Sequence, residues 1–134
     1  MGEARRNADR IVGSRGDKFG RAVMLEAMGR IMKRTPVDKG TARANWNVSR
    51  GAPDTSTDPA ATIADVGAKR AANEGRIAGI RLFEGDTGYI ANGLPYINEL
   101  ENGSSKQAPQ GMAKMTIEEL RPWAEGEARR LRNG

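Results

Sequence analysis

Carboxylates, hydroxyls and a lysine gather in residues 94–112, LPYINELENGSSKQAPQGM. Glu99 and Glu101 stand two residues apart, and a carboxylate pair is the machinery of glycoside hydrolysis. On a helix these two side chains diverge, and on a strand they share a face with no aromatic sugar platform nearby. The pair is therefore better explained as solvated or interface carboxylates than as an acid–base pair.

Ser104 or Ser105 with Lys106 has the composition of a serine–lysine dyad. Such a lysine must be desolvated, and no apolar surroundings are evident around Lys106. The chain contains no histidine and no cysteine, which removes the commonest general base, the thiolate nucleophile and the commonest metal ligands. The segments GDTG and EGD lack the lysine and hydroxyl of a phosphate-binding loop. We therefore expect no catalytic residue, no metal site and no cofactor.

Nucleic-acid binding is the next chemistry to weigh, because the net charge is +5 and the pI is about 10.0. Trp46 and Tyr96 have the ring systems that stack on bases. Two Trp, two Tyr and two Phe are few, however, and packing is the better use of them. Charges of both signs are interspersed along most of the chain, which favours a solvated surface. A small basic nucleic-acid-binding module remains the alternative function.

The totals indicate one soluble domain with a thin core. The chain has 134 residues, of which 37% are hydrophobic and 4% aromatic. Neighbouring subunits could supply missing burial. We find no apolar run long enough to span a membrane and no signal-peptide pattern, and expect a protein made in the cytoplasm.

The first 16 residues show no sustained apolar period and carry Arg5, Arg6, Arg10 and Arg15. This composition predicts a flexible basic arm that orders only against a partner, followed by one domain over residues 17–134. The domain begins with a helix from Lys18 to Arg34, with an apolar row at every fourth residue and two methionines beside it: Phe19, Val23, Ala27, Ile31, Met24 and Met28.

Pro36 ends that helix. Residues 41–51 alternate between small or apolar and polar side chains, which predicts a strand that buries Trp46. Residues 52–62 read as an exposed loop, and a short strand is expected at 62–66. A helix over about 67–82 is predicted from a stripe of small residues, with a strand at 86–92 after it. The stripe comprises Ala68, Ala71, Ala72, Gly75, Ala78 and Leu82.

PYINELEN, residues 95–102, fits a two-turn helix that ends at a left-handed Gly103, with an extended segment as the alternative. Pro109 then begins a last helix, in which Met112, Met115, Leu120, Trp123 and Leu131 follow helical spacing, and Pro122 should bend it. The order predicts an α+β fold: a small, mainly antiparallel sheet packed by an N-terminal and a C-terminal helix.

Two blocks resemble a known family. TPVDKGTARANW, residues 35–46, is similar to a TPVDTG…R.SW signature, and YIANGLPYINELENGSSKQAPQGM, residues 89–112, to an N.LPY…LE.G.S.QAP.GM signature. Both are signatures of the tail-completion family of long-tailed bacteriophages, the minor tail proteins of the lambda Z type. Lys39 and Thr41 depart from the commoner Thr and Arg. Residues 52–84 resemble nothing that aligns.

The resemblance implies a structural protein of the virion, made in the host bacterium, and not an enzyme. It implies a tail terminator in the neck: a ring of copies of this chain, usually six, that closes the head-proximal end of the tail. The implied partners are the major tail tube protein, the head-closure protein of the connector, and DNA passing through the lumen, with no membrane.

Gly103, Pro109 and Gly111 are expected to hold a turn that presents Ser104, Ser105, Lys106 and Gln107, although the turn could merely link two helices. The full expected interface adds residues from the arm and from both blocks. These are Arg5, Arg6, Arg10, Trp46, Tyr96, Glu101 and Met112.

Overall fold

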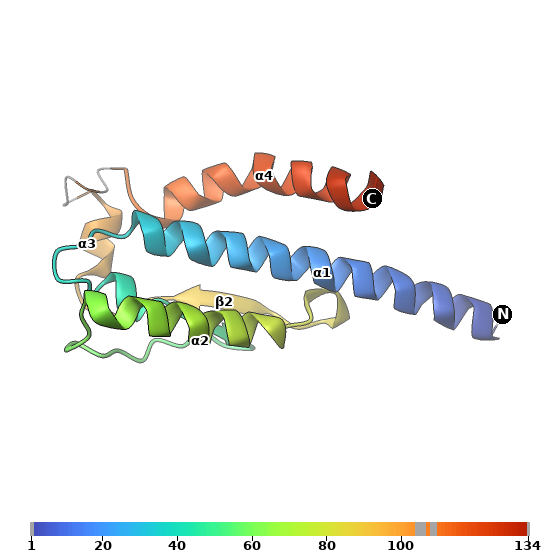
Figure 1. The fold of residues 1–134 in the computed structure, drawn as a ribbon, viewed down its shortest axis with the longest axis horizontal. Helices are drawn as coiled ribbons and strands as arrows, with labels where there is room; N and C mark the ends of the chain where they lie inside the picture. The colour runs from blue at the N-terminus through green and yellow to red at the C-terminus, as the bar shows by residue number, and fades with distance from the viewer. Residues whose placement is uncertain (1, 104–106, 108–109, 134) are drawn as a thin grey trace.

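The computed structural model describes residues 2–103, 107 and 110–133, with side chains from residue 16 onward. It consists of four α-helices, short 3-10 turns and one two-stranded sheet within that part of the chain. Figure 1 shows a long central helix that extends beyond the rest of the domain at its N-terminal end. The predicted α+β class, with a small antiparallel sheet and packed terminal helices, is confirmed.

Helix α1 spans Gly2–Arg34, so its predicted start at Lys18 was wrong. The backbone of residues 2–16, expected to be a separate arm, continues the same helix. At about 1.5 Å per residue, α1 is roughly 50 Å long. Arg5, Arg6 and Arg10 therefore lie on a helix, and the flexibility of this segment in solution stays a prediction.

The sheet pairs β1 (Asn47–Arg50) with β2 (Gly88–Ala91) in antiparallel register, with Val48 opposite Ile90. The strand predicted at 86–92 is confirmed, whereas the one predicted at 41–51 is shorter. Its first half forms a 3-10 turn, Arg43–Asn45, because the amide N–H groups there bond backward to Gly40 and Ala42 instead of to a partner strand.

The strand expected at 62–66 is absent from this described stretch. A 3-10 turn, Ile63–Asp65, takes its place, and a capping box between Thr62 and Asp65 favours it. It leads into helix α2, Val66–Ala78, which was predicted. The expected stripe of small residues was wrong: Asn73 and Ile77 are the buried positions of α2, while Ala68, Ala71, Ala72 and Gly75 are exposed.

A third 3-10 turn, Leu82–Glu84, precedes β2, and helix α3, Ile97–Glu101, follows it. The helical interpretation of PYINELEN is thus confirmed over the extended one. Helix α4 spans Ala113–Asn133 and runs through Pro122. The predicted start of this helix at Pro109 was wrong, because α4 begins at Ala113 after the left-handed Gly111; Pro109 itself lies outside the described residues, and the predicted bend stays a prediction.

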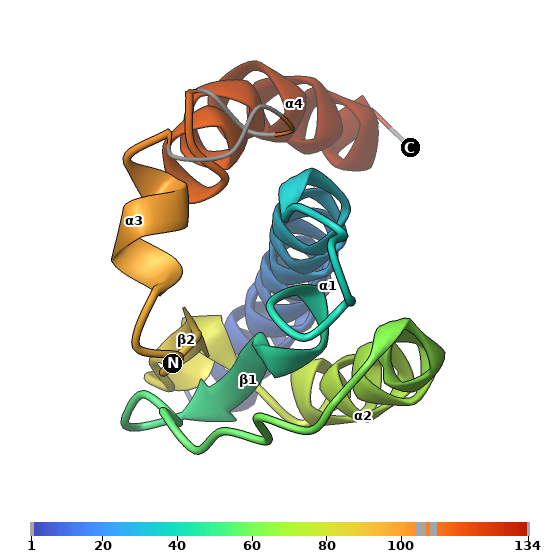
Figure 2. The same ribbon diagram turned by 90° about the vertical axis from the view of Figure 1, so that its left-hand side faces the viewer.

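Figure 2 shows α1 at the centre of the domain, with α4 on one side and the sheet and α2 on the other. The core lies between α1, β1 and α2, and consists of Met24, Met28, Ile31, Met32, Trp46, Val48, Ile77, Ile80 and Met112. The methionines beside the predicted row are therefore the deeper residues. Phe19, Val23 and Ala27 are only half-buried.

Candidate functional site

The two sequence blocks lie together at the end of the domain where α1 stops. The chain leaves α1 at Thr35, whose hydroxyl donates to the carbonyl of Ile31 at 2.6 Å. The indole N–H of Trp46 donates to the same hydroxyl at 2.7 Å. Arg43 donates to the carbonyl oxygens of Thr35 and Lys33, both at 2.9 Å. These bonds fix the turn of the first block on the end of α1.

Burial lowers the pKa of the Arg43 guanidinium from its ordinary value. Its hydrogen bonds go to carbonyl oxygens, which carry only partial charge. Arg43 therefore serves as a brace between two chain segments, and its bonds hold the start of the first block in place.

The second block enters this region through Asn92, whose side-chain amide donates to the carbonyl of Ala42 at 2.9 Å. The carbonyl oxygen of that amide accepts the N–H of Leu94 at 3.1 Å, and Leu94 is buried. Asn92 thus links the end of β2 to the first block. Gln107 makes a second link, because its Oε1 accepts the backbone N–H of Val37 at 2.8 Å.

Glu101 closes the start of α4. Its Oε1 accepts the N–H groups of Met112 at 3.0 Å and Ala113 at 2.8 Å, and its Oε2 accepts that of Lys114 at 2.9 Å. The first turn of a helix has no intrahelical partners for its N–H groups, and a carboxylate also complements the positive end of the helix dipole. Glu101 is therefore a helix cap supplied from a neighbouring helix.

Gly103 has φ +90° and Gly111 has φ +89°, both in the left-handed region. The predicted left-handed end of the short helix at Gly103 is confirmed. At Gly111 the chain also passes close to α3: a Cβ there would lie 2.6 Å from the backbone oxygen of Glu101. Only glycine meets both demands, so this position fixes the approach of α4 to α3.

A surface hollow of about 450 Å³ lies where the blocks meet, and we call it the motif hollow. Its lining joins the turn after α1 to α3 and Gln107, and comprises Pro36, Asp38, Lys39, Gly40, Thr41, Ala42, Tyr96, Leu100 and Gln107. Tyr96 is 39% exposed there and Leu100 is half-buried. Asp38 and Lys39 are exposed charges. The hollow thus combines an apolar patch with a charged rim.

The residues expected at the interface do not all lie on one surface of the subunit. Tyr96 and Gln107 line the motif hollow, while Glu101 and Gly103 shape its supporting turns. Trp46 and Met112, 6% and 0% exposed, belong to the core of the subunit, and their place in an interface stays a prediction. Ser104, Ser105, Lys106 and Pro109 lie outside the described residues.

Sequence reasoning missed a set of buried asparagines beside β1. Asn73 of α2 accepts the N–H of Val48 at 3.1 Å and donates to the carbonyl of Trp46 at 2.9 Å, so it acts as a substitute neighbour strand. Asn47 donates to the carbonyls of Asp54 and Ser56, at 3.2 and 2.9 Å. Asn45 donates to the carbonyl of Asp58 at 3.0 Å. For Asn45 and Asn47, their positions next to the β-prone Trp46 and Val48 were the available signal, and Asn73 had no such signal.

These bonds hold the loop of residues 51–60 against the body of the domain. The loop was expected to be exposed, and most of its side chains are. Its backbone is nevertheless held in place by the hydrogen bonds from Asn45 and Asn47. Hydrogen bonds from the hydroxyl and N–H of Ser56 hold the pKa of Asp54 below its ordinary value.

Within the part of the chain that the structure describes, no group of three or more acidic side chains is placed to hold a metal ion. None of the described helices combines the length and apolar character needed to cross a bilayer. No family model matches the chain, and no curated protein or solved structure matches it either.

Proposed function

We propose that this chain is a structural subunit of a phage tail, which forms a ring at the head-proximal end of the tail tube and joins the tail to the head. The observation that carries the proposal is that residues 35–46 and 89–112, the two blocks that resemble the tail-completion family, meet at the motif hollow. Blocks far apart in sequence thus build one surface, as a shared binding function requires.

The composition of the motif hollow supports a protein partner. Protein interfaces combine an apolar centre that includes aromatic residues with a polar rim. In the motif hollow, Tyr96 and Leu100 supply the apolar centre, and Asp38 and Lys39 supply the polar rim. The backbone turns around them are held by bonds from buried or half-buried side chains, so little ordering entropy is lost on docking.

A phage that lacks this chain tests the proposal. It should produce filled heads and separate tails, and the wild-type chain supplied in trans should restore joining. Normal infectious particles from the mutant phage would overturn the proposal.

A matched pair of variants examines the motif hollow in the same assay. Tyr96→Ser removes its exposed aromatic ring, whereas Ile117→Ser removes a 68% exposed apolar side chain on α4, outside the hollow. We expect Tyr96→Ser to reduce joining at least tenfold and Ile117→Ser to leave it unchanged. Circular dichroism should give both variants a melting temperature close to that of the parent.

Nucleic-acid binding is the second candidate, and the distribution of charge favours it. Helix α1 carries nine basic and four acidic residues, so its net charge of +5 equals that of the whole chain. Salt separates the two functions. A DNA binder that neutralises several phosphates loses affinity steeply as salt rises, with a log–log slope of about −0.9 per phosphate.

A further inference from the structure

A second and larger depression adjoins the motif hollow, with which it shares Gln107 as a lining residue. It has a volume of about 1070 Å³, and we call it the basic groove. Most of its lining comes from α1, with Arg70 of α2 and Glu119 of α4 at its sides. Small-molecule pockets measure about 300–1,000 Å³, so the groove is at least as large as these.

The groove is rich in cations. Five basic side chains line it, against two carboxylates, Glu26 and Glu119. Arg30 and Arg34 pair with Glu119, and Arg30 also pairs with Glu26. Lys33 is exposed and takes part in no ion pair within the described part of the chain. Each cation that the two carboxylates leave unneutralised favours an acidic occupant.

One apolar side chain lies among these charges. Leu25 is 42% exposed and lines the groove near the small residues Ala22 and Gly29. A groove with a ring of charge and an apolar centre suits a partner with the complementary arrangement: acidic side chains around one exposed apolar residue.

Another segment of this chain has acidic side chains around one exposed apolar residue. Residues 51–65, which we call the acidic loop, contain Asp54, Asp58 and Asp65 and no Lys or Arg. Asp58 and Asp65 are exposed, and Ile63 in the same stretch is 54% exposed. The anchoring bonds from Asn45 and Asn47 hold the loop in one conformation, which lowers the entropy cost of docking.

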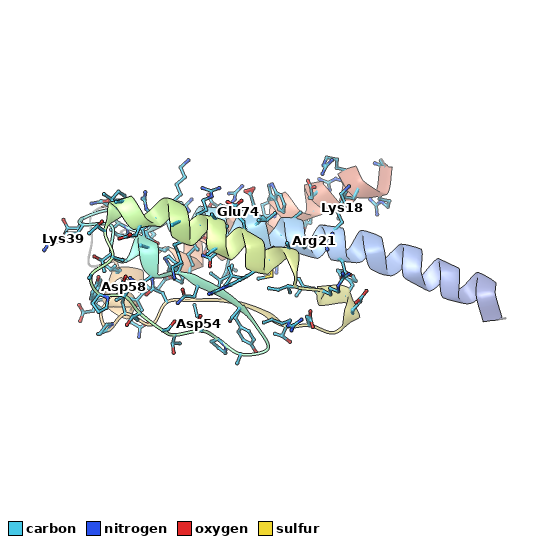
Figure 3. All side chains as sticks on the ribbon, turned by 60° about the horizontal axis from the view of Figure 1, so that its bottom comes forward. Lys18, Arg21, Lys39, Asp54, Asp58 and Glu74 are labelled. Carbon is cyan, nitrogen blue, oxygen red and sulfur yellow. The ribbon has the colours of Figure 1, made fainter. Side chains whose placement is uncertain are left out.

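The acidic loop and the basic groove occupy different sides of the domain. Figure 3 labels Asp54 and Asp58 below α2. In Figure 2 the backbone of residues 51–62 runs beneath β1 toward α2, whereas α1 and α4, which supply most of the groove's lining, lie above the sheet. A loop on one side therefore reaches the groove of another copy and not its own. Contacts between two different surfaces of identical subunits are head-to-tail contacts, and these generate rings when the rotation closes.

We propose that the acidic loop of one copy docks into the basic groove of the next copy, with Ile63 against Leu25, and that this contact builds the ring. The inference rests on the proposed function, because it names the partner through which the ring would close. A phosphate backbone fits the groove less well. The exposed apolar side chain of Leu25 offers nothing to a phosphate, whereas it can pack against an apolar residue of a protein.

Cysteine cross-linking tests the contact directly, because the chain has no native cysteine. One preparation carries Leu25→Cys in the groove and another carries Thr57→Cys in the loop. A short bis-maleimide is added to each preparation alone and to their mixture. Docking of loop into groove predicts cross-linked dimers in the mixture and almost none in either preparation alone. Abundant dimers in the Leu25→Cys preparation alone, or none in the mixture, would overturn the inference.

Charge reversal provides a second measurement with a matched control. Lys33→Glu reverses a groove cation, whereas Arg121→Glu reverses an exposed cation on α4 outside the groove. By mass photometry, we expect Lys33→Glu to weaken assembly at least tenfold and Arg121→Glu to leave it unchanged. Equal assembly of both variants would contradict the proposed contact. Weaker DNA binding by Lys33→Glu with unchanged assembly would assign the groove to nucleic acid, and this result would also overturn the proposed contact.

Failure of this inference can be told apart from failure of the proposed function. If the chain restores head–tail joining but the mixture gives no cross-link, the ring exists and closes through another surface. If the mixture cross-links but the chain plays no part in joining, the contact stands and the tail function falls.

Discussion

The indole N–H of Trp46 donates to the hydroxyl of Thr35 across 2.7 Å, and both side chains are buried. The same hydroxyl donates to the carbonyl of Ile31, so the bonds run from the core to the last turn of α1. Both partners of this relay belong to the first sequence block, residues 35–46. The block therefore sets the direction in which the chain leaves α1, and with it one wall of the motif hollow.

Trp46→Ala should lower the free energy of unfolding by about 3–5 kcal/mol, because it leaves a cavity in the core and removes the N–H that donates to the Thr35 hydroxyl. Urea denaturation measures this loss. The control is Trp123→Ala on α4, whose half-buried ring should cost clearly less. A Trp46→Ala variant that melts within a degree or two of the parent would contradict the core position of Trp46.

Gly111→Ala should destabilise the protein by about 1–3 kcal/mol, because alanine is strained at φ +89° and its Cβ would meet the backbone of Glu101. Gly126→Ala is the matched control. Gly126 lies within α4, and the nearest atom to an added Cβ is 3.9 Å away. That change should be neutral or stabilise by up to about 1 kcal/mol. If thermal melts rank the two variants in the opposite order, the close approach of α4 to α3 is wrong.

Asn73→Ala removes both of its hydrogen bonds and leaves the N–H of Val48, on β1, and the carbonyl of Trp46, just before β1, without this partner. Each unpaired group costs about 1–3 kcal/mol. Hydrogen exchange should report faster exchange at Val48 and in the acidic loop. Asn98→Ala, at an exposed position of α3, is the control and should change neither stability nor exchange. Unchanged exchange at Val48 in the Asn73 variant would sink this account.

The ion pairs of Glu119 with Arg34 and Arg30 should make stability depend on pH. The hydrogen bond from Arg34, with a further one from Arg30, holds the pKa of Glu119 below its ordinary value. A lowered pKa stabilises the folded state above the unfolded-state pKa, and this contribution is lost as the pH falls through the lowered value. Glu119→Gln should therefore be less stable than the parent near neutral pH, and the difference should vanish in acid.

Chemical denaturation across the acid range measures this difference. The control is Glu118→Gln, because Glu118 is exposed and takes part in no ion pair within the described residues. A constant difference between Glu119→Gln and the parent at every pH would show that the carboxylate acts through packing and not through charge.

Sequence patterns predicted elements whose signals are local. The end of α1 follows from Pro36, and the left-handed position at Gly103 follows from an Asn-Gly pair behind a short amphipathic segment. The strand at β2 follows from β-prone residues between glycine-bearing turns. Each of these features depends on neighbours within a few residues, which is why one sequence suffices to find it.

The missed features depend on distant contacts. Ala42 and Ala44 alternate as a strand would, yet hydrogen bonds within the segment favour a 3-10 turn there. Asn73 is buried on α2 because its side chain accepts a backbone hydrogen bond from β1. A periodic pattern of apolar residues cannot predict a buried position that is polar. The role of Glu101 as a cap for α4 likewise appears only when α3 and α4 are seen together.

Electron microscopy of isolated tails tests the central claim most directly. Tails from a phage that lacks this chain are incubated with the purified chain carrying a gold label, and the position of the label is scored. The proposal predicts one labelled ring at a single end of each tail, the end that joins the head. Label spread along the tube, or bare tail ends at saturating protein, would contradict it.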